Sequence, residues 1–343
     1  MTPEERLALI KRRTQELVKE EELIEIFKEK KHPKAYIGFA PTGRLHIGYL
    51  IPLMKIKDFL DADCEFTFLL ADLHAYLDDE KTPWDLLGVR VEYYKAAVTA
   101  ALKALGADTK RVSFVRGTDF QLKKDYTMHV YQMVGDVTLN RAKRSASEVV
   151  RFKEDPKLGG FVYPILQIED VYALEADIAF GGIDQRGIYM LGREFAEKMN
   201  RKKYACVFTP LLPGITGAKM SASDPSSKID LLDSPEEIVR KLNKANCPAG
   251  KLEDNGVVAF IENVIFPLLA SQKKPFVINR AEKFGGPLSY NIFEHFKSDF
   301  VAQKVHPLDV KTALGTVLVD LLGPVRESFA QNEKLLKDAY PDE

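Results

Sequence analysis

The sequence predicts an α/β fold in which a doubly wound parallel sheet is followed by a second, mainly helical domain. Two observations support this prediction. Short apolar runs bounded by Gly and Pro alternate with segments of helical spacing up to about residue 230, and helical patterns dominate from there to the end. A chain of 343 residues, 45% of them hydrophobic, also fits two domains better than one.

The predicted sheet begins after a charged N-terminal segment. Residues 1–27 mix acids and bases along an amphipathic helical pattern, which is unlike a signal peptide or an acid-poor transit peptide. No apolar run in the sequence approaches the roughly 18 residues that a membrane span needs. The candidate apolar positions of this segment are Leu7, Ile10, Leu17, Ile24 and Phe27.

Strand and helix patterns then alternate. Residues 35–39 form an apolar run that ends in a loop with Gly and Pro, which predicts a buried strand, and residues 45–60 have helical spacing. A second apolar run covers 66–71, and a strong helix pattern at 90–106 leads to a strand candidate at 112–115. This order predicts parallel strands joined by helical crossovers.

Residues 121 to about 155 depart from this alternation, because they are polar and helical in propensity and carry several cations. We expect an inserted helical segment, and a solvated helix face is the alternative. Further on, Ser234 stands at a helix-capping position, with Pro235 in the first turn and acids after it. The boundary between the two domains is therefore expected near residue 230. The cations of the insertion are Arg141, Lys143, Arg144, Arg151 and Lys153.

Charge and cysteine content restrict the function classes. The formal net charge is −1, so any contact with nucleic acid must come from local basic patches. Cys64, Cys206 and Cys247 are far apart, with no C-x-x-C and no nearby histidine pair. We therefore expect no structural metal and a reducing compartment.

The loop after the first strand has the glycine spacing of a phosphate-binding loop, G-x-x-x-x-G-K-[ST], counted from Gly38. Arg44 and Leu45 replace the lysine and the hydroxyl residue, which removes that function. His46 and Gly48 follow at an expected helix start, where backbone amides favour phosphate. His46 could donate to an α-phosphate during nucleotidyl transfer, and Gly48 would let adenosine approach the backbone. A structural histidine is the alternative.

A second candidate is the segment GITGAKMSAS at residues 214–223. Its glycines and small hydroxyl residues predict a mobile loop, from which Lys219 could contact a triphosphate and stabilise departing pyrophosphate. A surface turn with an exposed lysine is the alternative.

A third candidate lies on a predicted helix whose first turn would contain Pro164. Tyr163, Gln167 and Asp170 stand at i, i+4 and i+7, so they share one helix face. These polar groups stand among apolar neighbours, where burial without partners is costly. A polar ligand or a structural network would satisfy them.

These motifs together resemble a known family. The sequence HIGY at 46–49 resembles the "HIGH" signature of class I aminoacyl-tRNA synthetases, and KMSAS at 219–223 resembles their "KMSKS" signature. The run YPILQIEDVYALEADIAFGGIDQR is similar to the tyrosine-binding segment of tyrosyl-tRNA synthetases of the archaeal and eukaryotic cytoplasmic type. The resemblance spans nearly the whole chain. It implies a Rossmann-like catalytic domain at 1–230, with a connective insertion at about 121–155, and a helical anticodon-binding domain at 231–343.

The resemblance implies roles in binding tyrosine. Tyr36 and Asp170 would contact the phenolic oxygen, and Tyr163, Gln167 and Gln185 would hold the α-amino group. Phenylalanine would leave Tyr36 and Asp170 unpaired in a dry pocket, so no editing domain is expected.

It also implies a two-step reaction in a cytoplasmic enzyme. L-tyrosine and ATP, with Mg²⁺, would give tyrosyl-adenylate, and tRNA(Tyr) would then accept the tyrosyl group. Gly38, His46, Gly48 and Lys219 would bind ATP. The catalytic set would be His46, Gly48, Lys219, Ser221 and Ser223.

For the tRNA, the resemblance places an acceptor-stem contact at Arg186, where Gly187 replaces a second basic residue common in the family. Phe284 would stack on an anticodon base, and His306 and Asp309 would read its edge. A core phenylalanine and a His-Pro turn with an Asp cap are the alternatives. A homodimer formed through the 121–155 insertion is also implied.

Three other functions stay open. Tryptophanyl-tRNA synthetase shares the fold, although an indole would not satisfy Tyr36 and Asp170 as a phenol does. A small-coenzyme nucleotidyltransferase would not need about 110 helical residues after the lysine segment. A non-catalytic RNA-binding paralogue would be expected to lose His46 or Lys219, and both are present.

Overall fold

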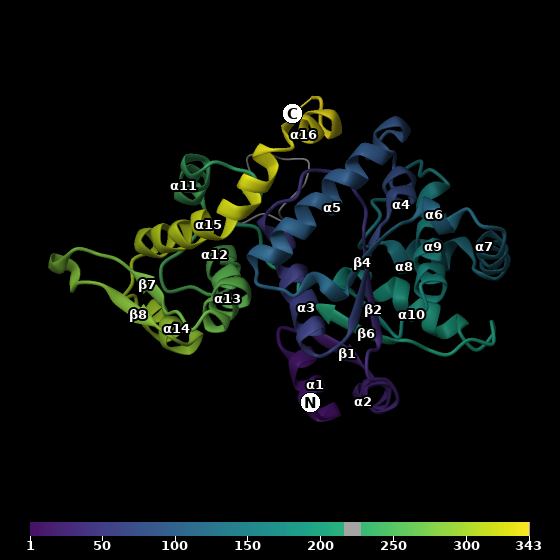
Figure 1. The fold of residues 1–343 in the computed structure, drawn as a ribbon, viewed down its shortest axis with the longest axis horizontal. Helices are drawn as coiled ribbons and strands as arrows, with labels where there is room; N and C mark the ends of the chain where they lie inside the picture. The colour runs from purple at the N-terminus through teal and green to yellow at the C-terminus, as the bar shows by residue number, and fades with distance from the viewer. Residues whose placement is uncertain (216–227, 343) are drawn as a thin grey trace.

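The computed structural model describes residues 1–215 and 228–342. Its centre is a six-stranded sheet of order β1-β6-β5-β2-β3-β4 (Figure 1). All neighbouring strands are parallel except β1, which pairs antiparallel with β6. The predicted doubly wound α/β class is confirmed. The strands are β1 Glu16–Val18, β2 Lys34–Phe39, β3 Glu65–Leu70, β4 Val112–Arg116, β5 Ile178–Gly182 and β6 Ala205–Thr209.

The strand order reverses between β2 and β5. The chain runs outward from β2 through β3 to β4 on one side, and from β5 to β6 on the other. In open parallel sheets, a crevice forms at such a point, outside the carboxyl ends of the strands, and ligands bind there. The helices that connect and cover these strands are α3 Leu50–Asp61, α4 Asp72–Leu77, α5 Leu87–Ala104, α6 Thr118–Gln121, α7 Lys124–Asp136, α8 Leu139–Ala146, α9 Gly159–Ala173 and α10 Arg186–Phe195.

The N-terminal segment contains helices, as its pattern indicates, and also an unexpected strand. Helices α1 (Pro3–Lys11) and α2 (Glu20–Glu29) flank the three-residue strand β1. Thr2 caps α1 with a full capping box, so this helix begins where sequence rules place it. A strand of three residues leaves almost no periodicity, and only its pairing with residues 206–208 reveals it.

The helix α9 begins earlier than expected. Pro164 does not stand in its first turn, because the helix starts at Gly159 and Pro164 lies inside it. A proline inside a helix cannot donate to the carbonyl four residues earlier, here that of Gly160. The sequence pattern therefore favoured a start near Pro164, which was too late. Gly159 packs against α4, where an added Cβ would lie 2.8 Å from the Leu77 carbonyl oxygen. Tertiary packing therefore fixes this helix start.

The C-terminal part is mainly helical, and Figure 1 shows it at the opposite end of the molecule from α7. Ser234 caps its first helix by accepting from the Glu237 amide, as predicted. A small antiparallel hairpin, β7–β8, was not anticipated from sequence. The elements are α11 Pro235–Lys244, α12 Gly256–Phe260, a π-helical turn Ile261–Ile265, α13 Phe266–Ser271, β7 Phe276–Ile278, β8 Leu288–Tyr290, α14 Phe293–Val301, α15 Pro307–Ala330 and α16 Glu333–Ala339.

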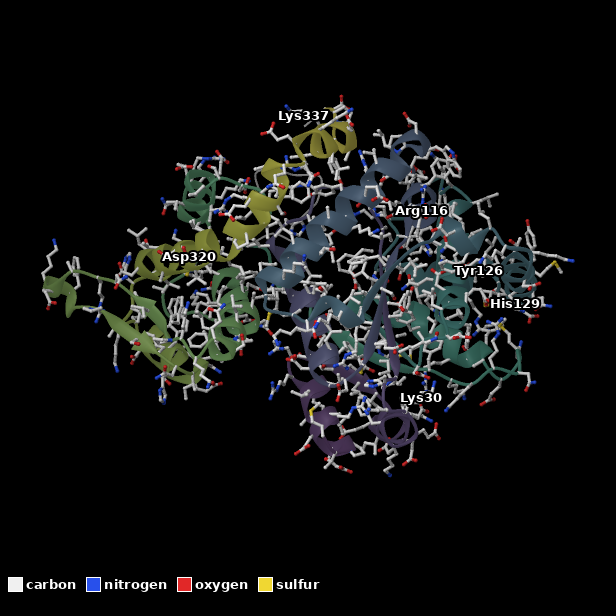
Figure 2. The ribbon with its side chains drawn as sticks, viewed as in Figure 1. Lys30, Arg116, Tyr126, His129, Asp320 and Lys337 are labelled. Atoms are coloured by element: carbon white, nitrogen blue, oxygen red, sulfur yellow. The ribbon has the colours of Figure 1, made fainter. Side chains whose placement is uncertain are left out.

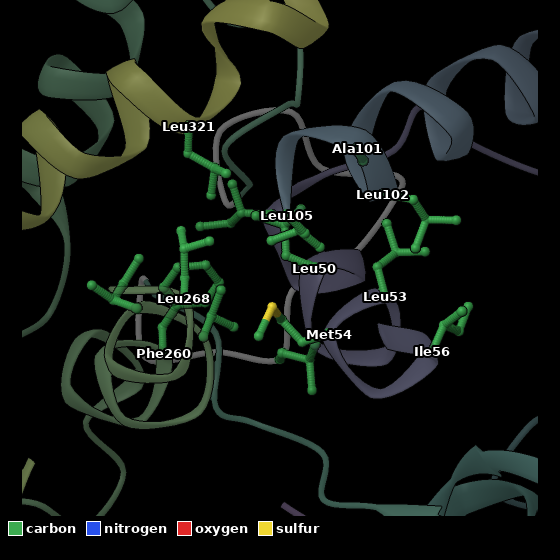
Figure 3. Close-up of a cluster of buried hydrophobic side chains, with 14 of the residues drawn as sticks. Leu50, Leu53, Met54, Ile56, Ala101, Leu102, Leu105, Phe260, Leu268 and Leu321 are labelled. Atoms are coloured by element: carbon green, nitrogen blue, oxygen red, sulfur yellow. The ribbon is translucent and has the colours of Figure 1, made fainter. Parts of the chain in front are cut away.

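One hydrophobic core runs across the predicted domain boundary. Side chains from α3 and α5 meet side chains from α12, α13 and α15 in a single buried cluster (Figure 3). Figure 3 shows Leu50, Met54, Leu105, Phe260 and Leu268 among its members. The placement of the boundary near residue 230 stays a prediction. None of the helices within residues 1–215 and 228–342 combines the length and apolar character that a membrane crossing requires.

Candidate active site

A cavity of about 460 Å³ opens at the carboxyl ends of β2 and β5, where the strand order reverses. It brings together residues predicted from three separate parts of the sequence. Lys219, Ser221 and Ser223 lie outside the described residues. A second cavity of about 590 Å³, beside α7 and the end of α9, contains none of the predicted residues. The predicted residues that line the first cavity are Tyr36, Gly38, His46, Gly48, Tyr163, Gln167, Asp170 and Gln185.

Asp170 lies fully buried on α9 and has one satisfied and one unsatisfied oxygen. Its Oδ1 accepts from Gln121 Nε2 and from the Tyr126 hydroxyl, both at 2.8 Å. Its Oδ2 has no hydrogen-bond partner among the described residues. Burial raises the pKa of Asp170 to about 7. An unpaired buried carboxylate oxygen at a cavity wall is suited to accept from a ligand.

Tyr36 lies on β2, with 1% of its surface exposed. Burial, followed by the nearby Tyr189, raises the pKa of Tyr36 well above its ordinary value, so its hydroxyl keeps the proton and can donate. Gly38 leaves space beside that hydroxyl, because an added Cβ would lie 3.3 Å from it. A glycine at this position therefore keeps the hydroxyl of Tyr36 uncrowded.

The other three predicted tyrosine-site residues lie on the same cavity. Gln167 Nε2 donates to Gln185 Oε1 at 2.9 Å, and Tyr163 is buried on α9. Two acids that the sequence reasoning missed, Asp78 and Asp184, also line the cavity. Both raise the pKa of Tyr163 after burial does, so they lie close to it. Their negative charge suits an ammonium group. Asp78 could have been found among the acids of ADLHAYLDD, which follow the end of β3, and Asp184 directly precedes the predicted Gln185.

His46 caps a 3-10 turn (Ile47–Tyr49) that precedes α3, so the regular helix begins at Leu50 and not at 45. Its Nδ1 accepts from the Gly48 amide at 3.2 Å. Burial, then Lys228, lowers the pKa of His46 to about 4. The neutral ring therefore carries its proton on Nε2, which leaves one N–H donor for the cavity.

The chain that follows the undescribed residues 216–227 runs beside His46. Ile47 donates its amide to the Ile229 carbonyl at 2.9 Å, and Leu231 donates to Leu45 at 3.0 Å. Arg44 Nη2 and Asp230 Oδ1 form an ion pair at 3.0 Å. Residues 229–231 are thus anchored to the loop that holds His46.

Arg186 is exposed at the start of α10 and pairs with Glu16 Oε2 at 2.7 Å. The residue after it has to be small. An added Cβ on Gly187 would lie 2.5 Å from the Ser145 carbonyl oxygen, so α10 and α8 pack too closely for a side chain there. A larger residue at position 187 would therefore require α8 or α10 to shift.

The predicted anticodon residues lie in the C-terminal part. Phe284 is 63% exposed on a short turn between β7 and β8, so it is not a core residue. Lys283 Nζ lies 5.0 Å from its ring centroid. His306 caps α15 by accepting from the Leu308 amide at 3.1 Å, and Asp309 follows in the first turn. The cap of α15 is therefore His306, and not Asp309 as the alternative interpretation had it.

The insertion presents an apolar surface. Figure 2 places Tyr126 and His129 on α7, at the end of the molecule away from the C-terminal helices. Tyr126 points inward to Asp170, whereas other apolar side chains on and around α7 are exposed. Among the described residues, no three His, Cys, Asp or Glu side chains are grouped so that they could hold a metal ion. The exposed apolar residues are Leu122, Met128, Tyr131, Val134 and Leu139.

Comparisons with known proteins identify the family. Residues 28–323 match the family described as "tRNA synthetases class I (W and Y)". The chain is 48% identical to the tyrosine–tRNA ligase of Haloarcula marismortui, over 100% of this chain and 99% of that protein. It is 46% identical to the cytoplasmic tyrosine–tRNA ligase of Xenopus tropicalis, over 99% of this chain and 64% of that longer protein.

Solved structures give the same result. The tyrosyl-tRNA synthetase of Archaeoglobus fulgidus, complexed with L-tyrosine, superposes with a TM-score of 0.88 at 40% identity, over 95% of this chain and 99% of that one. The tryptophanyl-tRNA synthetase of Giardia lamblia reaches a TM-score of 0.68 at 20% identity, over 93% of this chain and 84% of that one. The second likeness concerns the fold alone.

Proposed function

Because the chain belongs to the tyrosine–tRNA ligases of the class I tRNA synthetases, we propose that its cavity binds L-tyrosine and ATP and forms tyrosyl-adenylate. One observation carries the assignment of the amino-acid pocket. The fully buried Asp170 presents an unpaired Oδ2 at the cavity wall, while its Oδ1 is held by two donors. A phenolic hydroxyl is a donor that this oxygen lacks.

The phenol is recognised by two buried side chains, Asp170 and Tyr36. Asp170 Oδ2 accepts the phenolic hydrogen, and the protonated hydroxyl of Tyr36 donates to the phenolic oxygen. Phenylalanine offers neither contact, so it leaves the buried Oδ2 of Asp170 unpaired and gives the Tyr36 hydroxyl no acceptor beyond its neighbour Tyr189. An indole N–H donates but does not accept, so tryptophan cannot accept a hydrogen bond from Tyr36.

The α-amino group lies at the other end of the tyrosine. Tyr163, Gln167 and Gln185 hold it, and the carboxylates of Asp78 and Asp184 supply the negative charge that an ammonium group prefers. This leaves the carboxylate of tyrosine directed toward the ATP side of the cavity, where Gly38, His46 and Gly48 lie.

In the first step, the tyrosine carboxylate attacks the α-phosphorus of ATP, the bond to the bridging oxygen breaks, and pyrophosphate leaves. Positioning and electrostatics carry this step, since no protein nucleophile is needed. His46 donates from Nε2 to an α-phosphate oxygen as its charge grows, and its neutral state is maintained by burial. Lys219, Ser221 and Ser223 act on the pyrophosphate, and Mg²⁺ enters as part of the ATP substrate.

In the second step, a terminal ribose hydroxyl of tRNA(Tyr) attacks the tyrosyl carbonyl, and AMP leaves. Arg186 contacts the acceptor stem, and Phe284 stacks on an anticodon base, with His306 and Asp309 beside the base edge. The exposure of Phe284 supports this role, because a stacking platform has to be accessible. The cytoplasm is the proposed location, since related eukaryotic proteins carry that designation.

The enzyme acts as a homodimer through the 121–155 insertion. The exposed apolar side chains on and around α7 support this, because such a patch favours a protein interface. Sedimentation of the full chain should give the mass of a dimer. A Tyr131→Glu variant, which puts a charge in the patch, should shift the mass toward a monomer.

The assignment is tested by amino-acid-dependent exchange of labelled pyrophosphate into ATP. Exchange with tyrosine, and little with phenylalanine or tryptophan, is expected. Exchange supported best by tryptophan would contradict the tyrosine assignment. Binding of tRNA without exchange for any amino acid would support a non-catalytic role.

A further inference from the structure

His74 lies at the wall of the tyrosine pocket and has no assigned role. It comes from α4, after the end of β3, and only 2% of its surface is exposed. Neither ring nitrogen has a hydrogen-bond partner among the described residues. Leaving a buried polar atom unpaired is costly, so such an atom calls for an explanation.

Its Nε2 faces the other unpaired atom of the pocket. His74 Nε2 and Asp170 Oδ2 lie 3.7 Å apart, which is too long for a hydrogen bond. Both residues line the same cavity. A single oxygen with one hydrogen, placed at about 2.8 Å from each atom, would satisfy both, because it can accept from one and donate to the other.

The neighbouring side chains hold His74 in this orientation. Its ring packs edge-on against Tyr163, with centroids 4.6 Å apart. Asp170 cannot turn its free oxygen away, because Gln121 and Tyr126 hold the other one. Burial lowers the pKa of His74 to about 4, and the nearby Asp72 and the Tyr163 backbone oppose this only in part. The ring is therefore neutral and carries one N–H.

We propose that His74 determines specificity for tyrosine, by donating from Nε2 to the same phenolic oxygen that donates to Asp170 Oδ2. The inference rests on the proposed function, because it assumes that the pocket takes a phenol. A phenolic oxygen has one hydrogen and two lone pairs, so it can donate to Asp170 and accept from both His74 and Tyr36. Phenylalanine then leaves two buried atoms unpaired, Asp170 Oδ2 and His74 Nε2.

The test compares tyrosine with phenylalanine in pyrophosphate exchange. His74→Leu removes the donor and keeps an apolar side chain of similar reach. We expect its kcat/KM for tyrosine to fall about 10- to 100-fold, and its value for phenylalanine to stay within about threefold, so the preference for tyrosine shrinks. The KM for ATP should not change.

Two further variants separate recognition from packing. His74→Gln places an amide N–H near the position of Nε2, so it should regain part of the preference for tyrosine. Leu73→Ala truncates the neighbouring residue of α4, and it should leave the ratio of tyrosine to phenylalanine unchanged. An equal loss for both amino acids in His74→Leu and His74→Gln would overturn the proposal and make His74 a packing residue.

The outcome is distinguishable from a failure of the proposed function. If the wild-type chain does not exchange pyrophosphate with tyrosine at all, the assignment of the pocket is wrong. If the wild type prefers tyrosine and His74→Leu retains the full preference, only the role of His74 is wrong.

Discussion

Asp170 and Phe284 lie in two regions that recognise their ligands by different physics. Asp170 is 0% exposed, and the free oxygen of its carboxylate has no described partner. Phe284 is 63% exposed on a turn at the other end of the molecule. In the buried pocket, a lost contact leaves an atom that water cannot reach, whereas on the exposed turn water replaces what is lost. Loss of a single polar atom should therefore greatly reduce tyrosine binding in the pocket. On the exposed surface, several residues should each contribute a part of the tRNA-binding energy.

The largest expected effect is that of Asp170→Asn. We expect kcat/KM for tyrosine to fall about 10³-fold in pyrophosphate exchange, because the charged acceptor of the phenol is replaced by a neutral amide. The KM for ATP should not change. Glu169→Gln is the matched control, because this neighbouring buried carboxylate pairs with Arg201 outside the pocket. A smaller loss for Asp170→Asn than for Glu169→Gln would remove Asp170 from the recognition of tyrosine.

Next in size is the effect of His46→Ala on adenylate formation. Loss of one donor to the growing charge on the α-phosphate should lower the rate about 10²-fold, measured by exchange at saturating tyrosine. Tyrosine binding without ATP should be unaffected, because His46 acts at the other end of the cavity. Exchange at the wild-type rate would show that His46 is only the cap of its 3-10 turn.

Phe284→Ala tests the exposed region, and the expected effect is smaller. Stacking on an unpaired base contributes about 1–3 kcal/mol, so charging of tRNA(Tyr) should fall about 10-fold, while pyrophosphate exchange stays unchanged. Val277→Ala, at an exposed apolar position on the neighbouring strand β7, is the control and should charge normally. Equal charging by both variants would mean that Phe284 does not meet the tRNA.

The smallest predicted effect is on pH dependence. Burial raises the pKa of Asp170 to about 7, so the acceptor for the phenol is lost as pH falls below that value. The KM for tyrosine should rise a few-fold from pH 8 to pH 6, and Asp170→Asn should abolish this change.

The raised pKa of Asp170 affects the stability of the fold in the opposite direction. Without a ligand, the fold favours the protonated carboxyl, so the stabilising effect is complete below about pH 4 and is lost as pH rises through 7.

Sequence patterns predicted the pocket residues that share one helix, but not the residues that contact them from other elements. The spacing of Tyr163, Gln167 and Asp170 placed them on one helix face, and all three line the cavity. Gln121 and Tyr126 were not predicted to hold Asp170, because they reach it from α6 and α7 through tertiary packing. No periodicity within one element records such a contact.

The same distinction applies to the fold. The strands β2, β3 and β4 and several amphipathic helices were predicted, because their patterns extend over enough positions, whereas β5 and β6 were not located from sequence. The strand β1 was missed, since its three residues are defined by pairing with β6. The start of α9 was displaced, since Gly159 and its contact with Leu77, rather than Pro164, set it. His74 was missed because the residues it lies beside, Tyr163 and Asp170, belong to α9, far from it in the sequence.

The central claim is that buried unpaired atoms in this pocket recognise the phenolic hydroxyl of tyrosine. Calorimetric titration of the full chain with amino acids, without ATP or tRNA, tests it most directly. Tyrosine should bind, and phenylalanine should bind about 10²-fold more weakly or worse, because it leaves buried polar groups unpaired. Equal affinity for tyrosine and phenylalanine would contradict the account.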